Sequence, residues 1–265
     1  MTEDVDSAVR SWELPIETGE MPESGAEFDA IVVGGGPGGS SAAGYLAKSG
    51  ARVLLIEKEV WPRDKICGDA VGGKSLSHVN ELGVKADLES TPHFRVTGIL
   101  FSSPKGNSVR VPLPEEDVEK MEAGYALPRA QFDSLLFNRC QAMVREAGGS
   151  IIQGGEVRTV LFDDGGGGED PGEGSGDARH ATGVVVRIGG RNGEERTFHT
   201  RELVGAGGYR CPVARSVVES SYNEIMMDRD HYCGGYREYW QNVKGCEANV
   251  GDIEIHFVDT VIPGY

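Results

Sequence analysis

The chain has 265 residues, a hydrophobic content of 38% and a formal net charge of −16. This composition allows one large domain or two modest ones with a real core, and it excludes a fibre. The five cysteines form no CxxC pair, which argues against a disulfide framework and a zinc site. Basic stripes, long apolar runs and a signal-peptide pattern are also missing. We therefore expect a cytoplasmic protein without a nucleic-acid partner or a metal.

The negative charge is concentrated in two segments. Residues 1–27 hold eight acids and one Arg, and residues 163–180 hold six acids and one Arg. The first segment has little apolar periodicity, so we predict a disordered acidic tail. The second is rich in Gly, Asp and Glu and cannot bury itself, so we predict a flexible hairpin tip. The remainder of the chain is close to ordinary in charge.

The strongest pattern follows the acidic tail. An apolar run at 30–33 leads into Gly34-x-Gly36-x-x-Gly39, a helical segment of small residues and a second apolar run that ends at Glu57. This order predicts strand, turn, helix and strand. Gly34 permits a tight turn, Gly36 lets a pyrophosphate approach the backbone, and Gly39 lets the helix pack closely on the sheet.

Two further features indicate a dinucleotide site. The N-terminus of the predicted helix offers free N–H groups and the positive end of its dipole to phosphates. Glu57 lies 21 residues after Gly36, where a carboxylate accepts hydrogen bonds from a ribose diol. Glu rather than Asp at this position, followed by Lys58, favours FAD over NAD.

The remaining elements are predicted from periodicity and turn residues. Before the middle of the chain we expect a charged loop at 60–69, a short helix at about 73–82, strands at 94–101 and 108–113, and an acidic surface segment at 115–122. A long amphipathic helix is predicted from Arg129 to Ala147, ended by two glycines. Further strands are expected at 151–152, 157–162, 184–188, 203–206 and 253–257.

Several residues have two interpretations when only their types are considered. Arg129 could bind phosphate or ribose oxygens, or it could form a surface ion pair. Cys67 could be a reactive thiol or a small buried hydrophobe. Arg63 and Lys65 could neutralise an anionic cofactor or an anionic lipid head group, or they could belong to a solvated charged loop. Four aromatic residues could line a channel for an apolar chain or simply pack: Trp61, Tyr236, Tyr239 and Trp240.

Three motifs resemble the geranylgeranyl reductase family of FAD-dependent oxidoreductases, which shares the fold of p-hydroxybenzoate hydroxylase. They are VVGGGPGGSSAA at 32–43, EKEVWPRDKICGD at 57–69 and LPRAQFDSLL at 127–136. The segments VGAGGYRCPVAR at 204–215 and IEIHFVDTVIPGY at 253–265 resemble a second flavin-contact motif and a strand of the substrate domain. The resemblance covers residues 28–265.

The resemblance implies an α/β fold, in which a Rossmann-like FAD-binding domain is interrupted by an antiparallel β-rich substrate domain. The FAD-binding domain would take residues 28–90 and 126–217, and the substrate domain would take 91–125 and 218–265. Cys67 would face the flavin as a proton donor or redox gate. The implied cofactor-binding residues are Gly34, Gly36, Gly38, Gly39, Glu57, Lys58, Arg63, Gly68, Asp69, Arg129 and Gly207.

The resemblance further implies reduction of carbon–carbon double bonds in a polyprenyl lipid, with hydride added to one alkene carbon and a proton to the other. NAD(P)H or ferredoxin would supply the electrons, and the lipid substrate would require peripheral contact with a membrane surface. Two alternatives stay open. One is a flavin monooxygenase acting on an aromatic or quinone substrate, and the other is a flavin-binding protein without catalytic activity.

The chain departs from the family pattern at two places. Gly207 stands where many relatives carry an Asp, so the carboxylate that helps to hold the pyrophosphate side of the flavin is absent. The chain also stops before the Gly-Asp motif and helix that close the flavin domain of the family. We therefore expect a C-terminally truncated chain.

Overall fold

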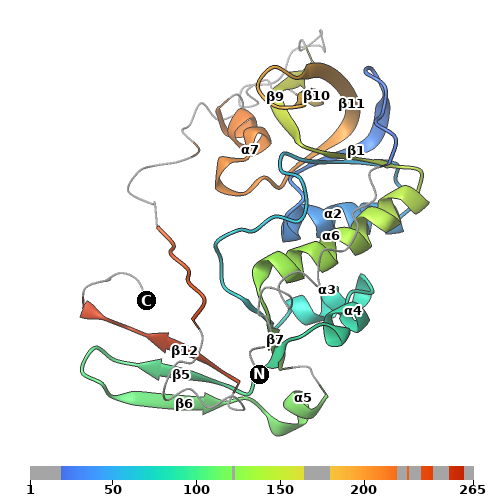
Figure 1. Ribbon diagram of the computed structural model, residues 1–265. Coiled ribbons are helices and arrows are strands. Elements are labelled where there is room, and N and C mark those ends of the chain that lie inside the picture. Colours follow the sequence, from blue (N-terminus) through green and yellow to red (C-terminus); the bar gives the residue numbers. More distant parts are fainter. Residues whose placement is uncertain are drawn as a thin grey trace, which may run out of the picture. The chain divides into compact units, whose positions relative to one another are not determined.

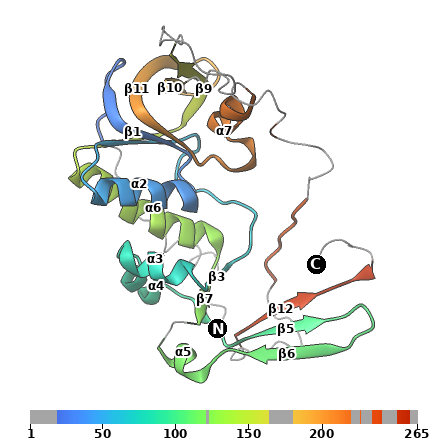
Figure 2. The ribbon, with the colours of Figure 1, turned by 180° about the vertical axis from the view of Figure 1, so that it is seen from behind.

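The computed structural model describes residues 19–120, 123–163, 180–219, 226, 234–240 and 251–259. The chain forms two compact units, coloured by sequence in Figure 1 and seen from behind in Figure 2. The first unit is drawn from Met1–Arg63 and Asp133–Gly234, and the second from Asp64–Phe132 and Gly235–Tyr265. The first boundary therefore falls at Arg63, whereas the sequence analysis placed it near residue 90.

The first unit is built on a mixed sheet. Its strands are β1 (Glu27–Val33), β2 (Val53–Glu57), β8 (Ser150–Gln153), β9 (Gly155–Phe162), β10 (Ala181–Ile188) and β11 (Glu194–Gly205), and its helical elements are α2 (Pro37–Lys48), most of α6 (Arg129–Glu146), the 3-10 turn η1 (Gly208–Arg210) and α7 (Pro212–Val217). The strand order is β8-β2-β1-β11-β10-β9. The first four strands of this order run parallel, whereas β10 is antiparallel to β11 and to β9. The predicted opening strand, helix and strand are confirmed.

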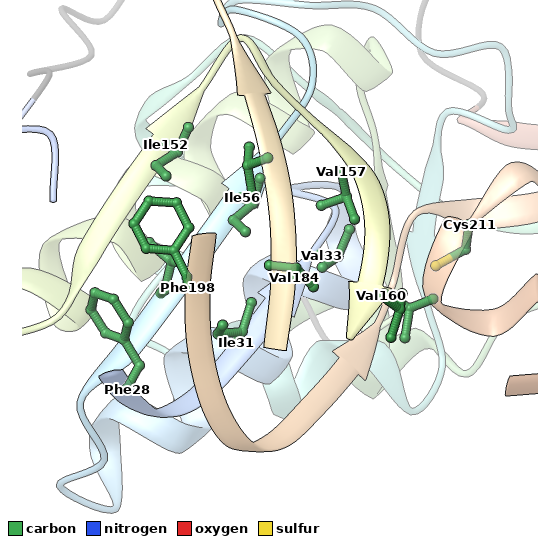
Figure 3. Packing of buried hydrophobic residues seen from close by; sticks show 13 residues of the cluster. Phe28, Ile31, Val33, Ile56, Ile152, Val157, Val160, Val184, Phe198 and Cys211 are labelled. Atoms are coloured by element: carbon green, nitrogen blue, oxygen red, sulfur yellow. The ribbon is translucent and has the colours of Figure 1, made fainter. Parts of the chain in front are cut away.

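The parallel part of this sheet is buried on both faces. All five residues of β2 are buried, and successive side chains enter different cores because strand side chains alternate. Leu54 and Ile56 belong to a core cluster with residues of β9, β10 and α7, including Val184 and Val213. Figure 3 shows this cluster, with Ile56 and Val184 labelled. The opposite face is covered by small residues of α2 and apolar residues of α6: Ala43, Ala47, Phe137 and Val144.

The second unit contains two small sheets. Its strands are β3 (Ala70–Gly72), β4 (Phe94–Arg95), β5 (Gly98–Ser102), β6 (Ser108–Pro112), β7 (Gly124–Ala126) and β12 (Asp252–His256), and its short helices are α3 (Ser75–Glu81), α4 (Lys85–Ser90) and α5 (Glu115–Glu119). One sheet has the order β3-β7-β4 and the other β12-β5-β6. Of the pairings in these sheets, only β12 with β5 is parallel, so the unit is mainly antiparallel.

The single strand predicted at 94–101 is wrong, because the structure divides it. The Val96 amide donates to the carbonyl of Gly124, whereas the Thr97 amide donates to the carbonyl of Gly251. The chain thus passes from one sheet to the other between adjacent residues. The strand is divided because Val96 and Thr97 pair with residues about 28 and 154 positions away, respectively. A local apolar pattern carries no information on such distant partners.

The end of the predicted acidic tail forms specific hydrogen bonds. The Gly25 amide donates to the carbonyl of Thr197, and the Arg196 guanidinium donates to the carbonyl of Pro22. Residues 1–18 and most of the acidic insert, 164–179, lie outside the described residues. No helix in the described part of the chain is long and apolar enough to cross a membrane.

Candidate functional site

The carboxyl ends of three neighbouring strands meet at one edge of the main sheet. Val33 at the end of β1 is paired with Ile56 on β2 and with Gly205 on β11. The residues that follow these positions are therefore level with one another. Ligands of open α/β sheets bind at such carboxyl ends, beside the strand where the order changes direction. Gly34, Glu57 and the 205–208 turn lie at this edge.

The glycines of the first turn are required by close packing. Gly34 has a φ of +110°, and a Cβ at this position would lie 2.4 Å from the carbonyl oxygen of Ala206. A Cβ at Gly39 would lie only 1.7 Å from the carbonyl oxygen of Gly34. The predicted tight turn and close helix packing are thus confirmed. Gly207 is part of the same contact, because its amide nitrogen lies 2.7 Å from the Cβ position of Gly34.

The N-terminus of α2 is open to a ligand. Gly36 is its N-cap and Pro37 its first residue, and no side chain caps the first turn. A Cβ at Gly38 would meet no atom within 4 Å, so the space beside this backbone is free. The first-turn N–H groups and the helix dipole at this point favour a phosphate group.

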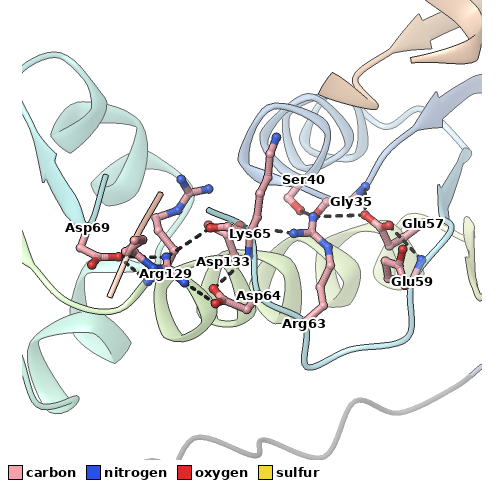
Figure 4. A network of polar contacts seen from close by, with 11 residues as sticks. Gly35, Ser40, Glu57, Glu59, Arg63, Asp64, Lys65, Asp69, Arg129 and Asp133 are labelled. Atoms are coloured by element: carbon pink, nitrogen blue, oxygen red, sulfur yellow. Dashed lines mark hydrogen bonds and ion pairs between the residues drawn. The ribbon is translucent and has the colours of Figure 1, made fainter. Parts of the chain in front are cut away.

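Glu57 is buried at the end of β2, with 4% of its surface exposed. Its Oε2 accepts hydrogen bonds from the Gly35 amide at 2.8 Å and from the Arg63 guanidinium at 3.2 Å, and its Oε1 accepts from the Glu59 amide at 3.0 Å (Figure 4). A carboxylate has about four lone-pair sites. In Glu57, three of these sites accept the hydrogen bonds just described. Glu57 also ends the second strand, where the sequence predicted a carboxylate that binds a ribose.

Arg63 is held between two carboxylates. Its guanidinium lies 3.2 Å from Glu57 and 3.7 Å from Asp133 of α6, and only 13% of its side chain is exposed. It also lies over the ring of Trp61 at 4.4 Å, and that ring stacks on Phe137 at 4.8 Å. The interpretation of Arg63 as part of a solvated loop is therefore wrong.

Asp133 is a site residue that the sequence analysis missed. It is almost fully buried and lies on the long helix that was correctly predicted. A polar residue at a buried helical position was the available signal, because buried carboxylates need a charged or hydrogen-bonding partner. The sequence pattern could not identify that partner as Arg63.

The second unit contains four of the predicted site residues, Cys67, Gly68, Asp69 and Arg129. Asp69 Oδ1 accepts a hydrogen bond from the Arg129 amide at 3.0 Å, and its carbonyl accepts from the Leu127 amide. Asp69 thus caps the first turn of α6 from a distant part of the chain. Arg129 is 8% exposed, which excludes the surface ion pair that its residue type left open.

The loop that ends at Asp69 presents its central residues to solvent. Cys67 is exposed, so it is not the buried hydrophobe of the second interpretation. Gly68 is also exposed, and a Cβ there would meet nothing within 4 Å. In the first unit, the Lys58 side chain is 68% exposed and lies 3.4 Å from Glu59. These two parts of the predicted site belong to different units.

The arrangement in the first unit fits a dinucleotide. Gly34 and Gly39 leave no room for a Cβ, no side-chain cap is found at the N-terminus of α2 among the described residues, and a buried carboxylate ends the adjacent strand. The fold and this site define a dinucleotide-binding protein. The chain belongs to the FAD binding domain family, whose model matches residues 27–228, and FAD is the cofactor of this family.

Relatives of the chain include two kinds of reductase. It is 30% identical over 241 residues to digeranylgeranylglycerophospholipid reductase 2 of Methanopyrus kandleri, an alignment that covers 85% of this chain and 54% of the relative. It is 28% identical over 198 residues to menaquinone reductase of Mycobacterium tuberculosis, with 75% and 42% covered. The resemblance to geranylgeranyl reductases is therefore confirmed. The chain spans about half the length of these relatives.

Solved structures extend the comparison to other flavoproteins. The myxobacterial chondrochloren halogenase, a variant of FAD-dependent halogenases, is 29% identical with a TM-score of 0.56. The match covers 72% of this chain and 39% of the halogenase. FAD-dependent enzymes with different reactions thus share this part of the fold, and the fold alone does not select one reaction.

Proposed function

We propose that this chain is the cofactor-binding part of an FAD-dependent reductase that saturates carbon–carbon double bonds of a polyprenyl group. The observation that carries the cofactor half of the proposal is the uncapped N-terminus of α2, which lies beside a glycine turn and the buried Glu57. The substrate half is supported by the relative named digeranylgeranylglycerophospholipid reductase 2, because this name describes reduction of a lipid with geranylgeranyl groups.

The first unit would hold the pyrophosphate and the ribose of FAD. Gly34, Gly36, Gly38 and Gly39 would place backbone N–H groups against the pyrophosphate, and Gly207 would keep the neighbouring turn close to it. The space beside Gly38 supports this role, because among the described residues nothing outside its chain neighbours and its own helix backbone lies within 4 Å of its Cβ position. Lys58 is exposed and would contribute only long-range positive charge.

Glu57 and Arg63 would exchange partners when the cofactor binds. Glu57 has one lone-pair site left, whereas a ribose diol needs acceptors for both hydroxyl groups. The Arg63 guanidinium lies 3.2 Å from the Cβ position of Gly36, at the turn where phosphate would bind. Arg63 would therefore release Glu57 to the ribose and turn toward the phosphate, while Asp133 keeps it in place.

The second unit would supply the proton. Reduced FAD would supply the hydride, after an external donor such as NAD(P)H or ferredoxin has supplied two electrons. The Cys67 thiol would protonate the other alkene carbon and would then recover its proton from solvent, to which it is exposed. Gly68 and Asp69 would bring the loop backbone to the flavin, and the buried Arg129 would contact the cofactor from the first turn of α6.

The experiment that tests the cofactor half is an anaerobic FAD titration of the purified chain, followed by visible absorption. We expect one FAD to bind and to bleach on reduction, and Glu57→Gln to weaken binding at least tenfold. Unchanged binding in that variant would refute the ribose role of Glu57.

The substrate half is tested by incubating the reduced protein with a polyprenyl lipid and measuring the gain of hydrogen pairs by mass spectrometry. The wild type is compared with Cys67→Ala and Cys67→Ser.

A second candidate is an oxygen-dependent flavoenzyme, which the 29% identity to an FAD-dependent halogenase favours. The two candidates differ in their use of oxygen. A reductase transfers hydride to its substrate without oxygen, whereas a monooxygenase or halogenase consumes oxygen in step with product. Product formation under strict anaerobic conditions would therefore exclude the second candidate.

A further inference from the structure

One arginine, Arg237, contacts both ends of the loop from Asp64 to Asp69. Arg237 donates to the carboxylate of Asp64 at the start of the loop and lies 3.4 Å from the carboxylate of Asp69 at its end. The same guanidinium donates to the carbonyl of Lys65 at 3.2 Å. All of these residues belong to the second unit, although 168 positions separate Arg237 from Asp69.

Asp69 joins the 64–69 loop to the first turn of α6 and to the segment 234–240. Its Oδ1 accepts from the Arg129 amide at 3.0 Å, from Arg237 at 3.4 Å and from the Tyr239 hydroxyl at 3.2 Å. The Tyr239 ring also lies under the Arg237 guanidinium, with 4.9 Å to the ring centre. Arg237 is therefore well enclosed, and only 13% of its side chain is exposed.

The residues between the two fastened ends remain exposed. Ile66 is 57% exposed, and Cys67 is also exposed. A free loop of this length would sample many conformations, and fixing each residue costs about 1–2 kcal/mol of entropy. Contacts at both ends reduce this freedom without covering the centre. The arrangement holds the Cys67 backbone in one place and leaves its thiol accessible.

We propose that Arg237 is a positioning residue that fixes the 64–69 loop, and through it Cys67 and Gly68, for the reaction at the flavin. This inference rests on the proposed function, in which the loop faces the flavin. Arginine suits this role because its planar group reaches several acceptors at once, whereas lysine carries a single charged point. Arg237 touches neither cofactor nor substrate in this proposal and acts only through the loop.

The test compares Arg237→Ala, Arg237→Lys and Tyr239→Phe with Arg158→Ala as the matched control. Arg158 forms an exposed ion pair with Glu156 on β9, so its loss removes an arginine without touching the loop. Hydrogen exchange of the peptide that contains 64–69 is measured first, without added FAD. We expect exchange to be roughly tenfold faster in Arg237→Ala, only partly restored in Arg237→Lys, and unchanged in the control.

The second readout is the visible circular dichroism of bound FAD, which responds to the groups around the flavin. We expect Arg237→Ala to change this spectrum. The unfolding midpoint of each variant is measured as well, so that a local change around the flavin can be distinguished from a loss of the fold. Unchanged exchange in Arg237→Ala would overturn the fastening of the loop. Faster exchange with an unchanged FAD spectrum would overturn the positioning role, while FAD binding itself would still stand. Absence of FAD binding in the wild-type chain would overturn the proposed function, and with it this role of Arg237.

Discussion

Replacing Gly39 by alanine provides a direct test of how α2 is seated on the glycine turn. The new Cβ would lie 1.7 Å from the carbonyl oxygen of Gly34 and 3.2 Å from the Cβ of Ala206. Real Cβ atoms essentially never come closer than 3.0 Å to such a neighbour, so α2 or the turn must move by more than an ångström. The oxygen belongs to the backbone and cannot rotate away. We expect a loss of about 3 kcal/mol or more in the free energy of unfolding.

Gly38→Ala is the matched control, because it adds the same methyl group one residue earlier. Its Cβ would meet no atom within 4 Å, and alanine is favoured over glycine inside a helix by roughly 0.5–1 kcal/mol. We therefore expect Gly38→Ala to be as stable as the wild type or slightly more stable. The same methyl group would stand where the pyrophosphate approaches, so its FAD affinity should fall while its stability does not.

The assay is urea unfolding followed by far-UV circular dichroism, together with an FAD titration of each variant. A lower midpoint for Gly39→Ala at an unchanged m-value would report lost stability rather than a changed unfolded state. If Gly39→Ala unfolds at the wild-type midpoint, the close contact between α2 and the turn does not exist. If Gly38→Ala binds FAD as the wild type does, the phosphate does not approach this part of the helix.

Three other predictions concern charged and ionisable groups. Glu57→Gln and Arg63→Met should each destabilise the protein in urea, but the double variant should cost about 1–3 kcal/mol less than their sum, because the two buried groups are direct partners. The hydrogen bond from Arg110 holds the pKa of Asp252 below its ordinary value, so the ionised carboxylate stabilises the folded state. This stabilisation is complete above the unfolded pKa of about 3.9 and is lost as the pH falls through the folded pKa. Asp252→Asn should therefore lower the urea midpoint at neutral pH, and the difference from wild type should vanish in acid. Burial raises the pKa of the Cys140 thiol to about 12, so alkylation followed by peptide mass mapping should label the exposed loop cysteine in the folded chain and Cys140 only in urea.

The part of the fold that could be predicted from the sequence is the part whose causes are local. The strand, turn, helix and strand from 27 to 57 follow from apolar runs and from glycines that the turn requires. The long helix at 129–146 follows from its apolar face and from the glycine that ends it, which has a φ of +75°. In these segments the apolar pattern and the turn glycines already indicate the element, although its partners in the sheet lie far along the chain.

The prediction was less successful where a distant partner decides the structure. Residues 194–202 were not predicted as a strand, although they extend β11. Its sequence is Glu-Glu-Arg-Thr-Phe-His-Thr-Arg-Glu, in which Phe198 is the one large apolar residue, so it lacks a continuous apolar face. Pairing with β10 and β1 nevertheless makes it part of the sheet. Strand propensity depends on the strands beside it, and a single sequence does not specify them.

The same reasoning applies to the charges of the site. The family motif implies that the backbone of Gly68 and Asp69 comes close to the flavin, and the Asp69 carboxylate accepts hydrogen bonds from Arg129, Arg237 and Tyr239. All three donors act on Oδ1, so this oxygen of the carboxylate has little capacity left for a ligand. Gly68 is exposed, so its backbone is available to contact a flavin, whereas Oδ1 of Asp69 already has three donors. The carboxylate has a different function, which is to join the loop to the first turn of α6. A substitution that keeps the negative charge but changes its reach, Asp69→Glu, should therefore disturb the loop nearly as much as Asp69→Asn does, and equal hydrogen exchange in Asp69→Glu and the wild type would show that charge alone is sufficient.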